Sequence, residues 1–193
     1  YEKALGMREK LYAEHPSAYA DVLATNYNNL GVLHYNIKGY GKAREYYEKA
    51  LRMQEKLYAE NPSAYADVLA LTYHNLGGLY RGIKEYGKAR EYHEKALEIR
   101  EKLYAENPSA HAPDLAKTYV SLAYLYKALN KYSEAREYYE KALRMREKLY
   151  AENPAAYAPG LVAVYGNLAE IYEKLGKARL AKECRRKLKS LKQ

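Results

Sequence analysis

The sequence has few of the residues that build covalent, metal or membrane-spanning structures. It contains one cysteine in 193 residues, which excludes an internal disulfide framework and a zinc site made of several cysteines. No segment approaches the roughly 20 consecutive apolar residues of a transmembrane helix. Six prolines and 11 glycines are too few for a collagen-like or disordered chain. Phenylalanine and tryptophan are absent, so the aromatic part of a core must come from the 25 tyrosines, whose hydroxyls need hydrogen-bond partners.

Positive charge is confined to one end of the sequence. The net charge is +9, but residues 174–193 contain nine Lys or Arg and a single acid, Glu183, whereas the preceding residues contain 24 basic and 23 acidic side chains. This basic C-terminal segment is a candidate for binding nucleic acid or another anion. It lacks interleaved aromatic residues, so a solvated capping helix is the favoured interpretation and nucleic acid is the less favoured partner.

A step of 46 residues organises the rest of the sequence. Pro16, Pro62, Pro108 and Pro154 follow this step, and so do the Leu-Tyr-Ala-Glu segments that precede them. Within each unit the apolar residues recur at intervals of three and four, which is typical of helices with one apolar face. Because few residues separate successive helices, the pattern predicts an all-α protein of stacked antiparallel helix pairs.

The repeat also predicts where the helix pairs begin and end. We expect a single array with a partial second helix at 1–15, helix pairs at 18–60, 64–106 and 110–152, and a last pair with the basic capping helix at 156–193. Short glycine-bearing turns at 39–41 and 84–87 are expected inside the pairs. The Asn-Pro-Ser-Ala-Tyr-Ala segments are expected to be connectors between pairs. Pro113 would break a helix that ran through from Pro108, and Pro159 would do so one unit later.

These units resemble the tetratricopeptide repeat (TPR). That motif places an aromatic residue and Leu-Gly on its first helix, and alanines around an aromatic residue on its second. The first two units carry Tyr27, Leu30, Gly31, Ala43, Tyr47 and Ala50, then Tyr73, Leu76, Gly77, Ala89, His93 and Ala96. Residues 113–116 and 142–149 are similar to the long-helix TPRs of kinesin light chains. The resemblance implies a right-handed α-α superhelix, the TPR solenoid, and a role in protein–protein interaction.

Differences between the units are concentrated in the first helix. Residues 47–66 and 93–112 share 15 of 20 identities, whereas 74–87 and 120–133 share 4 of 14. By the resemblance, the variable positions of the first helix line a concave groove that binds a peptide. The candidate groove residues are Asn28, Asn29, Tyr35, Asn36, His74, Asn75, Arg81, Lys117, Tyr124, Lys127, Asn167 and Glu170.

The chemistry of these residues suits a peptide. Asparagine can donate to and accept from an extended backbone, and tyrosine offers rigid contact area. Arg81, Lys117 and Lys127 can meet carboxylates, so an acidic protein or peptide is one expected partner, although Glu170 opposes it. The alternative is that these positions face solvent and the chain is a structural or engineered repeat scaffold without a dedicated ligand.

No motif favours catalysis. The five histidines have no metal-ligand spacing, and the sequence contains no glycine-rich phosphate loop. Cys184 aligns with Tyr46, Tyr92 and Tyr138 of the earlier repeats, so we expect it to be packed in the core. We therefore predict no enzyme activity, no cofactor, no metal site and a cytoplasmic location. Residues 1–5 align with 47–51, so we expect an excerpt of a longer array, in which end-to-end self-association through the truncated first helix is a further alternative.

Overall fold

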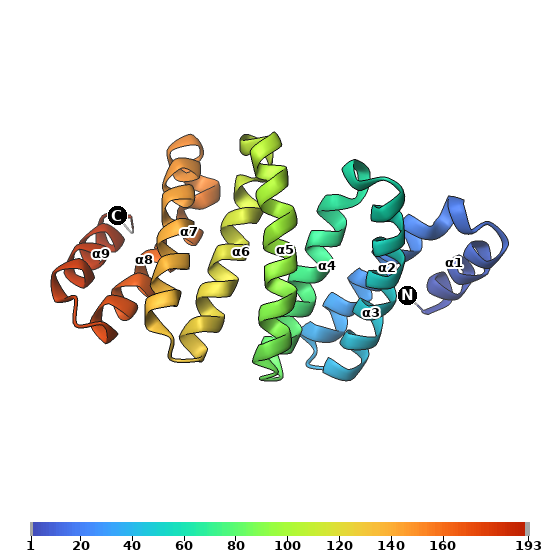
Figure 1. Ribbon diagram of the computed structural model, residues 1–193, viewed down its shortest axis with the longest axis horizontal. Helices are drawn as coiled ribbons and strands as arrows, with labels where there is room; N and C mark the ends of the chain where they lie inside the picture. Colours follow the sequence, from blue (N-terminus) through green and yellow to red (C-terminus); the bar gives the residue numbers. More distant parts are fainter. Residues whose placement is uncertain (1, 192–193) are drawn as a thin grey trace. The chain divides into compact units, whose positions relative to one another are not determined.

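The computed structural model describes the backbone of residues 2–191 and the side chains of residues 5–191. Over this range the chain forms nine helices and no strand (Figure 1), which confirms the all-α prediction. The helices are α1 (Glu2–Glu14), α2 (Pro16–Asn36), α3 (Tyr40–Glu60), α4 (Pro62–Gly82), α5 (Tyr86–Glu106), α6 (Pro108–Ala128), α7 (Tyr132–Glu152), α8 (Pro154–Lys174) and α9 (Ala178–Ser190).

The chain divides into two compact units. Unit 1 comprises residues 1–99 and unit 2 comprises residues 100–193, so that α5 begins in one and ends in the other. In unit 1, α2 packs on α1 and α3, and α3 packs on α4. In unit 2, α7 packs on α6 and α8, and α8 packs on α9 (Figure 1). Each unit therefore consists of helix pairs that contact mainly their sequence neighbours, as expected for a repeat.

Successive pairs are joined by one residue, and the predicted connectors are wrong. Helices α4, α6 and α8 begin at the proline itself, directly after Asn61, Asn107 and Asn153. The side chain of each asparagine accepts a hydrogen bond from the backbone N–H three residues later, at 3.1–3.3 Å. Proline is favoured at the first helical position because its missing N–H would have no partner there. The segment from proline onward is therefore a capped helix start.

Pro113 lies inside α6 and Pro159 lies inside α8, so neither proline breaks its helix. Both stand in the second turn, near an exposed helix end. Pro113 removes the hydrogen bond that its N–H would donate to the carbonyl of Ser109, which is exposed and can be solvated. A proline so close to the end costs a helix less than one in its middle.

The turns inside the pairs depend on four residues with positive φ, and the glycines expected to form the turns at 39–41 and 84–87 are not among them. Lys38, Lys84 and Asn130 have φ values of 61°, 64° and 57°, and Gly176 has a φ of 70°. Gly41 and Gly87 instead lie in the first turns of α3 and α5. The left-handed position is therefore strained by a side chain in three turns and relaxed by glycine in the fourth.

The TPR small residues allow the two helices of a pair to approach closely. A Cβ atom added to Gly31 would overlap the ring of Tyr47, and one added to Gly77 would overlap the ring of His93. Both rings are almost fully buried, at 2% and 1% exposed. The glycine is thus required by the aromatic ring of the second helix that covers it.

Candidate functional site

The predicted groove residues of unit 1 lie along α2 and α4 and contact one another across the two helices. Asn28 is 5% exposed, and its Oδ1 accepts hydrogen bonds from Thr72 Oγ1 at 3.2 Å and from Asn75 Nδ2 at 3.1 Å. Both donors belong to α4. Asn28 therefore bridges two consecutive first helices, and its side chain is not available to a partner.

The other predicted residues of unit 1 are more accessible. Asn29 and Asn36 are exposed, and His74 and Arg81 are half-buried. The ring of Tyr35 lies 5.8 Å from that of Tyr40, measured between centroids, and it faces Gly82 of α4, where an added Cβ would lie 3.5 Å from Tyr35 Cε2. The ring of His74 meets that of His93 edge-on at 5.3 Å. Unit 1 thus offers a polar surface with two rings fixed in place.

Four of the five predicted residues of unit 2 form one hydrogen-bonded group between α6 and α8. Asn167 Nδ2 donates to Tyr124 Oη at 3.0 Å and to the carbonyl of Ala163 at 2.8 Å. Lys127 Nζ donates to Asn167 Oδ1 at 3.3 Å and forms a 2.6 Å ion pair with Glu170 Oε2. Sequence reasoning set Lys127 against Glu170 as opposing preferences for a ligand, whereas the two charges neutralise each other.

Lys117 is also engaged, with Nζ 2.9 Å from Asp114 Oδ1. Two of the three cations that were predicted to meet an acidic peptide therefore already have carboxylate partners. This changes the expected ligand chemistry of the first-helix surface, because an internal ion pair leaves little net positive charge to attract an acid.

One set of hydrogen bonds, which sequence reasoning missed, recurs in each 46-residue repeat. The hydroxyls of Tyr27, Tyr73 and Tyr119 donate to Glu9, Glu55 and Glu101 at 2.6, 2.7 and 2.8 Å, and Tyr165 donates to Glu147. Burial, then the hydrogen bond to glutamate, raises the pKa of each tyrosine above its ordinary value. Both residue types follow the 46-residue step 18 positions apart, which is the signal that could have revealed the pair. The hydroxyls thereby obtain the partners that an all-tyrosine core needs.

The remaining candidates have structural surroundings. Cys184 is 7% exposed, and burial followed by the charges of Glu183, Glu140 and Glu147 raises the pKa of its thiol to about 11, which disfavours the reactive thiolate. Within the described residues no group of three or more His, Cys, Asp or Glu is placed to hold a metal ion. The same residues contain no helix that is both long and apolar enough to span a bilayer.

Helix α9 has the two-sided character predicted for it. Ala181 and Cys184 are buried and Leu188 is half-buried, whereas the lysines and arginines of this helix are exposed. Arg185 pairs with Glu173 of α8 at 2.5 Å. The basic charge is therefore displayed on the outer face of a packed helix.

Comparison with protein families matches tetratricopeptide repeats to residues 21–102 and 68–148, and again to residues 162–193. The chain belongs to the tetratricopeptide repeat family. Its fold class is accordingly the all-α helical-repeat superhelix. No curated protein matches this TPR chain.

Solved structures agree with the TPR fold. A putative kinesin light chain of Podospora anserina with nearly identical TPR-like repeats is 23% identical, with a TM-score of 0.69 over 98% of this chain and 82% of that one. The apo form of RapI is 20% identical, with a TM-score of 0.78 over 98% of this chain and 62% of that one. The Rap conjugation gene regulator of plasmid pLS20, solved in complex with the Phr* peptide, is 18% identical, with a TM-score of 0.65 over 90% of this chain and 44% of that one.

The kinesin light chain resemblance is thus confirmed at the level of fold. This TPR chain spans less than two thirds of the length of either Rap protein. At these identities the likeness concerns the fold alone.

Proposed function

We propose that this TPR chain is a non-catalytic interaction module that binds an extended segment of a partner protein along its first helices. One observation carries the proposal: the positions that vary between repeats come together on neighbouring first helices, α2 with α4 and α6 with α8. Variation gathered on one surface is what a recognition surface requires, while the second helices keep the repeat uniform. The Phr* peptide bound by a Rap protein of the same fold supports this reading.

The contacts within the surface divide its residues into two roles. Asn28, Asn75 and Asn167 hold neighbouring first helices together, because their amides are already hydrogen-bonded between α2 and α4 or between α6 and α8. The exposed amides of Asn29 and Asn36 remain on the surface to pair with the backbone of an extended peptide. Peptide recognition would then rest on unit 1 more than on unit 2.

The ligand of this surface is expected to be polar and not strongly acidic. Lys117 and Lys127 are paired with Asp114 and Glu170, so that an acidic peptide would have to displace an existing partner. We retain a cytoplasmic location as part of the proposal, since a single buried free cysteine suits a reducing compartment.

Selection from a displayed peptide library against the full chain tests the proposal. Peptides that are recovered would be measured by fluorescence anisotropy with the wild type and with the combined variant Asn29→Ala, Asn36→Ala and Arg81→Ala. We expect binding to weaken about tenfold or more, because truncation of central interface residues typically costs over 1 kcal/mol.

A matched control removes exposed arginines of the second helices in the same unit, Arg44→Ala with Arg90→Ala. This control should leave affinity within about twofold of the wild type, since peripheral contacts contribute little. Equal losses in both variants would contradict a first-helix site. A library that yields no binder would favour the structural or engineered scaffold, and recovery of peptides that require α9 would favour the basic end.

A further inference from the structure

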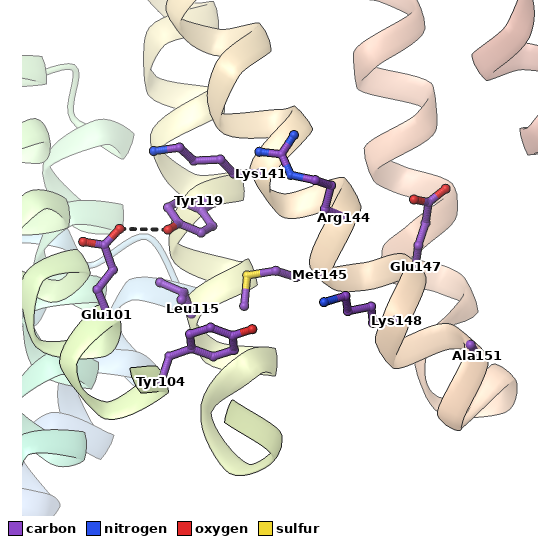
Figure 2. A pocket seen from close by; sticks show the side chains of 10 residues that line it. All are labelled: Glu101, Tyr104, Leu115, Tyr119, Lys141, Arg144, Met145, Glu147, Lys148 and Ala151. Carbon is purple, nitrogen blue, oxygen red and sulfur yellow. Dashed lines mark hydrogen bonds between the residues drawn. The ribbon is translucent and has the colours of Figure 1, made fainter. Parts of the chain in front are cut away.

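A second concave surface lies in unit 2, away from the residues of the first-helix surface. It is a groove of about 800 Å³ between the end of α5, the middle of α6 and the second half of α7. Tyr104, Leu115, Tyr119 and Met145 form its apolar part, with Leu115 and Tyr119 buried (Figure 2). Its volume lies in the range of pockets that hold ligands or side chains of a partner.

Three cations line one side of this apolar part. Lys141, Arg144 and Lys148 all belong to α7 and are exposed. None of the three forms an ion pair with a carboxylate of the described residues. They differ in this from Lys117 and Lys127 on the first-helix surface.

Comparison between repeats shows that Lys141 departs from the repeated pattern. The equivalent lysines Lys49 and Lys95 each pair with a glutamate four residues earlier, Glu45 and Glu91, at 2.8 Å. The corresponding acid of α7, Glu137, instead lies 3.7 Å from Arg136. Lys141 lies over the rings of Tyr119 and Tyr138, at 5.4 and 5.5 Å from their centroids. Its charge is thus held at the rim of the groove.

The acids near the groove are already occupied. Glu101 accepts the Tyr119 hydroxyl at 2.8 Å, as Figure 2 shows, and Glu147 accepts the Tyr165 hydroxyl of α8. Each carboxylate is therefore turned toward a tyrosine, which leaves the three cations as the groups able to meet a ligand.

We propose that this α7 groove binds an acidic segment of a partner protein. An apolar side chain of the segment enters between Tyr104, Leu115 and Met145, and neighbouring carboxylates meet Arg144 and the two lysines. Charge complementarity over an apolar floor selects this occupant, and guanidinium favours carboxylate through paired hydrogen bonds. The proposal is independent of the one made for the first-helix surface, because the two share no residue.

The chain provides an internal control for this proposal. Arg144 and Met145 correspond to Arg52 and Met53 in the first repeat. Met53 there packs against the buried cluster of Leu23, Tyr27 and Ala50. The second repeat carries Glu98 at the position of Arg144, so a glutamate is compatible with this part of the helix.

The test uses a fluorescent peptide of alternating glutamate and leucine, with a matched peptide in which glutamine replaces glutamate. Anisotropy is measured with the full chain, its Arg144→Glu and Arg52→Glu variants and a Met145→Ala variant, whose folding is checked by circular dichroism. We expect Arg144→Glu to weaken binding of the acidic peptide about tenfold or more and Met145→Ala to weaken it severalfold, with Arg52→Glu within about twofold of the wild type. The glutamine peptide should bind at least about tenfold more weakly than the acidic one.

Several outcomes would overturn the proposal. These are absence of binding by the wild type, equal losses in Arg144→Glu and Arg52→Glu, and a glutamine peptide that binds as well as the acidic one. Tighter binding of a single-stranded DNA probe with the same dependence on Arg144 would identify a phosphodiester as the occupant and also overturn it. The variant with Asn29, Asn36 and Arg81 replaced should bind the acidic peptide normally, so failure of either proposed site is seen separately.

Discussion

Arg100 and Arg146 occupy the same position in consecutive repeats, but they have different surroundings. Arg100 is 4% exposed and donates to Thr118 Oγ1 at 2.5 Å and to the carbonyl of Asp114 at 3.2 Å. One repeat later, Val164 stands in place of Thr118 and Gly160 in place of Asp114. Within the described residues the buried Nε of Arg146 has no hydrogen-bond partner, and burial lowers the pKa of this guanidinium.

The same position in unit 1 differs again. Arg8 donates to Asn26 Oδ1 at 2.7 Å, whereas Gln54 is 2% exposed and its Oε1 has no partner among the described residues. Thr72, which corresponds to Thr118, donates instead to Asn28 of the preceding first helix. A nearly identical second helix therefore does not guarantee identical contacts, because the facing first helix decides which partner is available.

The largest effect is expected from replacing the two arginines by an apolar residue of similar length. Arg100→Met should lower the free energy of unfolding by about 3 kcal/mol, because it removes charged hydrogen bonds from a buried site. Arg146→Met should change it by less than about 1 kcal/mol or raise it, since it removes a buried cation with an unbonded nitrogen. Urea unfolding followed by circular dichroism measures both, and equal losses would remove the distinction between the two positions.

The buried amide bridge of unit 1 should rank next. Asn28→Ala leaves the Thr72 hydroxyl and the Asn75 amide without their common acceptor, which is expected to cost about 2 kcal/mol. Asn29→Ala alters the exposed neighbouring amide and should cost less than about 0.5 kcal/mol. A comparison of the two unfolding midpoints is sufficient, and a small loss in Asn28→Ala would mean that Thr72 finds another partner.

The turns offer a comparison of the same kind, with a smaller effect. Gly176→Ala places a side chain at a φ of 70° and should destabilise the chain by about 1 kcal/mol. Lys84→Gly removes the side chain from a residue with a φ of 64°, so it should leave the free energy of unfolding unchanged or raise it by up to about 1 kcal/mol. Opposite shifts in melting temperature are the expected result, and a destabilised Lys84→Gly variant would indicate that the lysine side chain contributes more than its backbone costs.

The smallest effect concerns the pH dependence of stability that arises from Asp114, whose carboxyl lies near Arg100. Burial acts to raise the pKa of Asp114, but the hydrogen bond from Lys117 and the charges of Arg100, Lys117 and His111 outweigh it and lower the pKa. A lowered carboxyl pKa contributes stability above the unfolded value of about 4, which is lost as pH falls through the folded value. Asp114→Asn should therefore lower stability at neutral pH and flatten its decline below about pH 4. The free energy of unfolding is measured for both proteins between about pH 7 and pH 3. The same decline with falling pH in both proteins would contradict the prediction.

Much of the architecture follows from the sequence. The 46-residue step and the spacing of the apolar residues predict one partial helix followed by four helix pairs, which gives the nine helices observed in the described residues. Gly31 and Gly77 predict close contact between the helices of a pair, because only a small residue fits beneath a buried ring. The helix starts differ from the prediction. The sequence pattern indicates that proline breaks the helix, whereas Asn61 and its equivalents cap a helix that begins at the proline. Local propensity allows both outcomes, and capping geometry selects one.

The candidate surface was only partly accessible to sequence reasoning. The all-α repeat, the variation among the first helices and the basic C-terminal segment can all be predicted from the sequence, because periodicity and composition are properties of the chain itself. Only the packed structure shows that Asn28 is buried, that Lys127 is neutralised by Glu170, and that three cations of α7 beside the groove form no ion pair within the described residues. These outcomes depend on which side chains meet across helices some 40 residues apart, and that distance in sequence is bridged only when the hairpins pack.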